Sequence, residues 1–156
     1  MNAMNRIEIA LVDPGTPAIT AMFDELNAYM SALYPAESNH FASVETLRQP
    51  NVRFFGAKLN GEFVGCGGIV MEGKEYSEVK RIFVSNATRG LGIGRKLIEA
   101  LAEASLKEGI TLMRLETGIS QPEALALFAV CGFTRCGSFG DYPADDPYSV
   151  FMDRVL

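Results

Sequence analysis

The chain has 156 residues, of which 48% are hydrophobic and 21% charged, and its formal net charge is −5. These values predict one folded domain over residues 1–156 and exclude a disordered chain. No apolar run reaches the ~18 residues of a membrane span, and the N-terminus lacks a signal-peptide core. Because the net charge is acidic, we expect no nucleic-acid or membrane partner, and we expect a cytoplasmic protein.

The cysteines and the single histidine make a metal site an unfavoured interpretation. The three cysteines are Cys66, Cys131 and Cys136, and the histidine is His40. An odd number of cysteines at irregular spacing fits neither a disulfide framework nor a zinc site. We expect reduced thiols and no metal.

The first half of the chain predicts a helix and an antiparallel meander. Apolar residues alternate over 6–12, recur at helical spacing over 18–33, and flank an Asn-Gly hairpin turn at 60–61. The predicted elements are strand 6–12, helix 18–33, loop 34–40, short helix 43–48, and strands 52–59, 62–71 and 76–84.

The second half alternates strands and helices. Helix 97–107 stops at Gly109, and a capping box of Ser120 and Glu123 is expected to start the next helix, which Gly132 ends. Strand 112–117 lies between these helices, and strands 133–137 and 149–155 close the chain around an acidic loop at 140–147. The order predicts a mixed α/β fold.

A glycine-rich turn, Arg-Gly-Leu-Gly-Ile-Gly-Arg-Lys at 89–96, joins strand 76–84 to the following helix. Glycines let the backbone approach a phosphate, which the N–H groups and the dipole of a helix N-terminus then bind. The spacing of Gly90, Gly92 and Gly94 fits neither the dinucleotide fingerprint nor the nucleotide triphosphate loop. A different phosphate-binding device is therefore predicted.

This turn, the strand Glu-Val-Lys-Arg-Ile-Phe-Val at 78–84 and the segment 115–133 together resemble the GNAT superfamily of acyl-CoA N-acyltransferases. The resemblance covers about residues 52–156. It implies a mixed, mostly antiparallel sheet that splays between the 78–84 and 112–117 strands, with helices on both faces. It also implies direct transfer of an acetyl group from acetyl-CoA to an amine.

The resemblance assigns residues to the acetyl-CoA site. The backbone near Phe83 would supply the oxyanion donor, and Gln121 would contact the pantetheine arm. The full set of expected cofactor residues is Ile82, Phe83, Val84, Arg89, Gly90, Leu91, Gly92, Ile93, Gly94, Arg95, Lys96, Gln121 and Phe128.

The residues that move protons are less sharply defined. Glu78 is the first candidate for the base, although it could instead form a strand-end ion pair with Lys80 or Arg81, and Glu116 is the second candidate. Many family members have a tyrosine acid at the position of Phe128, which has no proton to give. Either a tyrosine of the closing hairpin (Tyr142 or Tyr148) or water would then protonate the thiolate.

The acceptor is predicted to be a small-molecule amine or an amino-acid-like metabolite. His40 lies in the segment that shapes the acceptor pocket of the family, and Glu116 could hydrogen-bond substrate. The acidic loop either attracts a cationic amine or forms a solvated turn. A CoA-binding module without turnover and a protein acetyltransferase are the alternatives, and a homodimer through the closing strands is compatible with the family.

Overall fold

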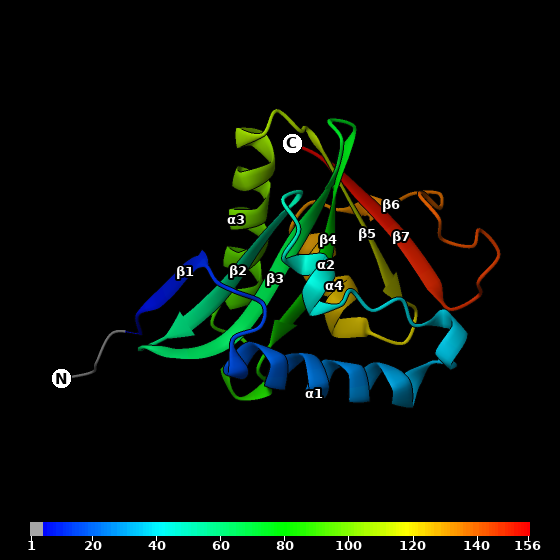
Figure 1. Ribbon diagram of the computed structural model, residues 1–156. Helices are drawn as coiled ribbons and strands as arrows, with labels where there is room; N and C mark the ends of the chain where they lie inside the picture. The colour runs from blue at the N-terminus through cyan, green and yellow to red at the C-terminus, as the bar shows by residue number, and fades with distance from the viewer. Residues whose placement is uncertain (1–4) are drawn as a thin grey trace.

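The computed structural model describes residues 5–156 and is built on one seven-stranded sheet with the order β1-β2-β3-β4-β5-β7-β6 (Figure 1). All neighbouring strands are antiparallel except β4 and β5, which are parallel. The mixed, mostly antiparallel sheet is therefore confirmed. The strands are β1 (Ile7–Leu11), β2 (Val52–Leu59), β3 (Glu62–Glu72), β4 (Tyr76–Val84), β5 (Leu112–Gly118), β6 (Thr134–Arg135) and β7 (Ser149–Val155).

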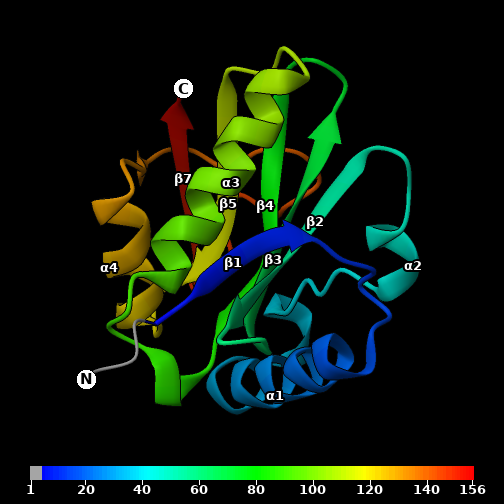
Figure 2. The same cartoon turned by 90° about the vertical axis from the view of Figure 1, so that its left-hand side faces the viewer.

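Helices cover both faces of the sheet, as predicted. In Figure 2, α3 and α4 lie on one side of the strands and α1 and α2 on the other. Each pair buries its own apolar cluster, one centred on Leu101 and Met113 and the other on Phe23 and Phe54. The α-helices are α1 (Pro17–Leu33), α2 (Val44–Leu47), α3 (Ile93–Lys107) and α4 (Pro122–Val130), and short 3-10 turns lie at Ala36–Ser38 and Asn86–Thr88. Within residues 5–156, none of these helices has the length and apolarity needed to span a bilayer.

The sheet opens between β4 and β5. These strands pair only at Ser77 with Met113 and at Glu78 with Arg114, and then diverge (Figure 1). The predicted splay is thus confirmed, and the β5-facing edge of residues 79–84 has no strand partner. Backbone N–H and C=O groups along that edge are available to a ligand.

A β-bulge interrupts β4 at the splay. On β3, Gly68 pairs with Lys80 and Cys66 pairs with Phe83, so two β4 residues lie opposite one β3 residue, and Arg81 has a positive φ of 60°. A Cβ on Gly67 would come within 2.4 Å of the end of the Ile82 side chain, so glycine lets Ile82 pack closely against β3 at the bulge. Because a bulge breaks the alternation of side chains, the side chains of Lys80 and Arg81 both lie on the α1 face.

Three predicted local features were wrong. Helix α3 begins at Ile93, four residues before Leu97, because Gly92 takes the left-handed conformation as N-cap with φ 80°. The capping box does not form: Gln121 is the N-cap of α4, and no side chain caps it. The first closing strand shrinks to Thr134–Arg135.

Candidate functional site

A cavity of about 670 Å³ lies at the splay, bounded by α1, β4, β5, the glycine-rich turn and the start of α4. A cavity of this size suits a small molecule. Most of the predicted site residues line it: His40, Ile82, Phe83, Val84, Arg89, Gly90, Gly92, Ile93, Gly94, Arg95, Glu116, Gln121 and Phe128.

Four predicted site residues do not line the cavity: Glu78, Leu91, Lys96 and Tyr142. Leu91 and Lys96 are exposed on the outer side of the glycine-rich turn. Glu78 is 8% exposed and lies, with Tyr142, behind the cavity wall. Tyr148 and the acidic-loop aspartates do not line the cavity either.

The glycine-rich turn forms an anion site at one end of the cavity. Gly90 and Gly92 have φ values of 87° and 80°, and no atom lies within 4 Å of where a Cβ would be on either. Arg89 and Arg95 line the same end, at the N-terminus of α3. This open backbone next to a helix N-terminus and two guanidinium groups fits a pyrophosphate.

Gly94 has a different role from the other two glycines. A Cβ there would come within 2.8 Å of Leu127, so the third glycine lets α3 pack closely against α4. Close packing places the N-terminus of α3 next to the start of α4, where Gln121 also lines the cavity.

Gln121 is held in place by Tyr34, at the end of α1. The Tyr34 hydroxyl accepts the Ser120 N–H at 3.1 Å and donates to Gln121 Oε1 at 3.2 Å. The Tyr34 ring occupies the space that a side chain at Gly118 would need, since a Cβ there would lie 1.9 Å from the hydroxyl. This buried contact, which ties α1 to the β5–α4 junction, was not predicted from the sequence.

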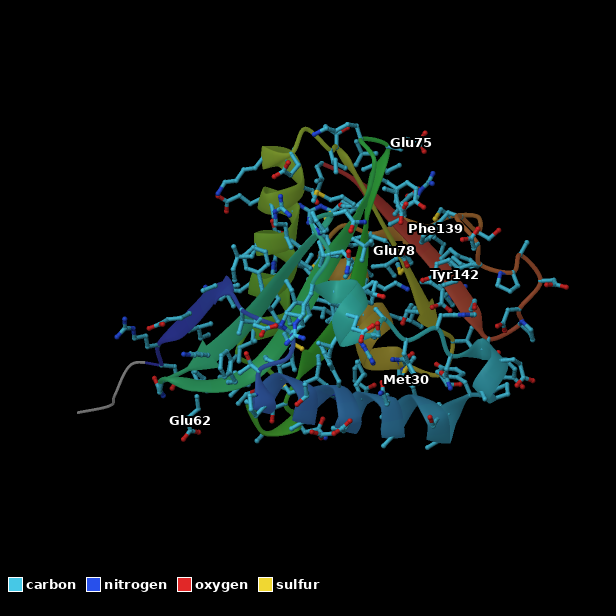
Figure 3. All side chains as sticks on the ribbon, viewed as in Figure 1. Met30, Glu62, Glu75, Glu78, Phe139 and Tyr142 are labelled. Carbon is cyan, nitrogen blue, oxygen red and sulfur yellow. The ribbon has the colours of Figure 1, made fainter. Side chains whose placement is uncertain are left out.

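A buried cluster of Glu78, Lys80 and Tyr142 lies where β4 and β5 part. The Lys80 ammonium is 3.1 Å from the Glu78 carboxylate, and the Tyr142 hydroxyl is hydrogen-bonded to both. Figure 3 shows Glu78 and Tyr142 close together beside Phe139. Burial and the Glu78 charge raise the pKa of Tyr142, which therefore keeps its proton at neutral pH.

Glu116 lies on the cavity wall, on the β5 side of the splay. It accepts a hydrogen bond of 2.8 Å from the Ser149 hydroxyl. Burial raises its pKa from 4.5 to about 7, against the lowering effects of Ser149 and the Lys80 charge. A carboxyl group with this pKa is half ionised near neutral pH, which suits a general base.

His40 lines the cavity and packs edge-on against Tyr142, with ring centroids 5.2 Å apart. Its Nε2 is buried without a hydrogen-bond partner in the described residues. Lys80 and Arg81 also line the cavity. The sequence suggested Lys80 and Arg81 only as ion-pair partners of Glu78. Their charge within the otherwise apolar strand β4 was a pattern that could have indicated cavity residues.

Comparison with known proteins identifies the family. Residues 19–133 match the model of the acetyltransferase (GNAT) family. The chain belongs to the GNAT family. It is therefore an acetyl-CoA-dependent N-acetyltransferase.

Relatives of this GNAT chain match it over nearly its full length. An "IAA acetyltransferase" of Azospirillum brasilense is 40% identical over 98% of this chain and 100% of its own length. A crystal structure from Klebsiella pneumoniae, assigned as an acyl-CoA N-acyltransferase, has 30% identity and a TM-score of 0.83, covering 96% of this chain and 97% of that one. An N-acetyltransferase of Thermoplasma acidophilum in complex with coenzyme A shares the fold, with a TM-score of 0.72 at 14% identity, over 97% and 99% of the two chains.

Proposed function

We propose that this GNAT enzyme transfers the acetyl group of acetyl-CoA to the primary amine of a small molecule. The observation that carries the proposal is the cavity at the splay, whose volume of about 670 Å³ suits a small molecule. Residues of α1 and of the segment 38–42 line its acceptor side. The Arg81 side chain links that segment to β4 by donating to the Ala42 carbonyl at 3.1 Å. The 40% identical relative, named for the acetylation of IAA, also supports a small acceptor.

The co-substrate would lie along the unpaired edge of β4. Arg89, Arg95 and the N–H groups of the glycine-rich turn would bind its pyrophosphate. The backbone of residues 82–84 and the Gln121 side chain would bind its pantetheine arm, and the thioester would then reach the bulge. Bulged residues leave N–H groups without a strand partner, and these are suitable donors to the oxyanion.

Glu116 is the better candidate for the general base. Its carboxylate lines the cavity, whereas that of Glu78 is bonded to Lys80 and Tyr142 behind the wall. The raised pKa of Glu116 matches the proton acceptor that an ammonium substrate requires near neutral pH. Glu78 would then orient Lys80 and not act on the substrate.

Water is the best candidate to protonate the departing thiolate. Phe128 carries no acidic group, and the Tyr142 hydroxyl lies behind the cavity wall with its proton donated to Glu78. A thiol has an ordinary pKa of about 8.5, so its thiolate needs little help to leave. Tyr142 would act as a positioning residue for Glu78 and Lys80.

Two measurements test the proposal. Calorimetric titration of acetyl-CoA should give one site with an affinity around micromolar. A panel of small amines should then release free CoA thiol, whereas lysine-containing peptides should release none above the rate of hydrolysis. Release from peptides alone would replace the small acceptor with a protein. Binding without release from any amine or peptide would contradict the proposed transfer.

A further inference from the structure

The acceptor half of the cavity is the part lined by α1, residues 38–42, Lys80, Arg81 and Glu116, and it contains two basic side chains. Arg81 uses two of its five N–H donors on α1 and on residue 42. Its guanidinium donates to the Ala42 carbonyl and to Asn27 Oδ1, and it packs over the rings of Phe23 and Phe41 at 4.8 and 5.1 Å. Arg81 therefore links α1 and residues 38–42 to β4.

Lys80 has a donor to spare. An ammonium has three N–H donors. Glu78 and Tyr142 accept two of them, and the third has no partner among residues 5–156. Lys80 lines the cavity and Glu78 does not, so a molecule in the cavity meets the ammonium and not the carboxylate behind it.

A second polar group without a partner lies on the same cavity wall as Lys80. His40 Nε2 is buried and unpaired in the described chain, and it also belongs to the cavity wall. Both side chains pack on Tyr142: the imidazole centroid is 5.2 Å from that ring and the Lys80 ammonium 5.0 Å. One carboxylate can accept from both groups, from the third Lys80 N–H and from His40 in the tautomer that carries its proton on Nε2.

The remaining wall of the acceptor half is apolar. Leu26, Tyr29 and Met30 line it from α1, and Phe41 lines it from the segment 38–42. Figure 3 labels Met30 on α1. Tyr29 and Phe41 are 43% and 40% exposed, which is high for such large apolar side chains. An apolar group on the ligand would cover them.

We propose that the acceptor carries a carboxylate and an apolar body besides its amine, as aliphatic and aromatic amino acids do. The carboxylate binds Lys80 and His40, the amine faces Glu116 across the splay, and the apolar body packs against α1. This inference rests on the proposed function and narrows its substrate class. It makes Lys80 a residue that determines specificity.

The test compares acceptors that differ only in the carboxylate. Thiol release is measured with leucine and phenylalanine and with their primary amides, leucinamide and phenylalaninamide. Because a hydrogen bond to a charged group is lost with the carboxylate, kcat/KM for each acid should exceed that for its amide by about 10- to 100-fold. In Lys80→Met this ratio should fall toward one.

Two further variants separate recognition from structure. Lys80→Met leaves the Glu78 carboxylate buried without its cation, so the double variant Lys80→Met with Glu78→Gln is measured as well and should lose the ratio equally. Lys107→Met removes a lysine from the exposed end of α3 and should keep the wild-type ratio.

The outcomes distinguish carboxylate recognition from acetyl transfer to an amine. Equal kcat/KM for acids and amides, or an acid preference that persists in both Lys80 variants, would overturn carboxylate recognition and leave the transfer to amines intact. Thiol release from other amines without any from amino acids would do the same. No release from any amine would overturn the proposed function itself.

Discussion

Replacing Gly92 with valine should abolish acetyl-CoA binding while the fold survives. Gly92 has φ 80°, and a Cβ there meets no protein atom within 4 Å, so the protein itself does not exclude the side chain. The cost to stability is then the left-handed backbone strain alone, about 1–2 kcal/mol. For a domain of this size that corresponds to a Tm lower by roughly 2–8 °C. The branched side chain would, however, fill the space in which the pyrophosphate meets the turn.

Gly61 provides a matched control. It has φ 89° in the β2–β3 hairpin, a Cβ there also meets nothing within 4 Å, and it does not line the cavity. Gly61→Val should therefore lower Tm by a similar amount and leave acetyl-CoA binding unchanged by calorimetry. If Gly92→Val binds acetyl-CoA as the wild type does, the glycine-rich turn is not the pyrophosphate site. If Gly61→Val also loses binding, the effect comes from strain and not from the site.

Three more substitutions test the other parts of the site. Glu116→Gln should lower kcat about 100-fold or more. In the wild type, kcat/KM should rise about tenfold from pH 6 to pH 8, because the base works in its ionised form and its pKa is about 7. If the same rise persists in the variant, Glu116 is not the base. Glu78→Gln should lower kcat by less than about tenfold, and a loss as large as that of Glu116→Gln would return the base to Glu78. Tyr34→Phe should cost about 1–3 kcal/mol in chemical denaturation and weaken acetyl-CoA severalfold, since Gln121 and the Ser120 N–H lose their partner; unchanged affinity would remove Gln121 from the co-substrate site.

Glu116 also links pH to stability. Its pKa in the folded protein, about 7, is above the ordinary 4.5, so the folded protein holds this proton more tightly than the unfolded chain. The contribution of Glu116 to stability is therefore greatest below pH 4.5 and declines until the pH passes 7. Removing the carboxyl in Glu116→Gln should make Tm less sensitive to pH across that interval, as measured by differential scanning calorimetry.

The sequence predicted the parts of the site that depend on local backbone. A glycine-rich turn after a strand and before a helix has few functions, and the cavity wall contains most of the residues assigned on that basis. The order of the elements along the chain and the β2–β3–β4 meander were also recoverable, because hydrophobic periodicity and the Asn-Gly turn at 60–61 are local signals. The splayed sheet was expected only from the resemblance to the family.

Long-range contacts were not recoverable. Tyr34 bonds to Gln121 across 87 residues and Tyr142 to Glu78 across 64. No periodicity encodes such pairs, and the bond from Tyr34 to the Ser120 N–H replaces the capping box that the local pattern of Ser120 and Glu123 indicated. Glu78 was ranked above Glu116 as the base because of its position along a strand. Access to the cavity depends instead on which side chains lie between the carboxylate and the cavity.

The bulge in β4 also constrains how this protein can change over time. Before the bulge, even-numbered residues such as Glu78 and Lys80 lie on the α1 face; after it, Phe83 packs there and Ile82 and Val84 pack on the α3 face. Deleting one residue here would exchange these faces, sending Phe83 into the α3 core and Ile82 toward α1. Single substitutions in this stretch can be tolerated one at a time. An insertion or deletion would require the apolar clusters on both faces of the sheet to repack together.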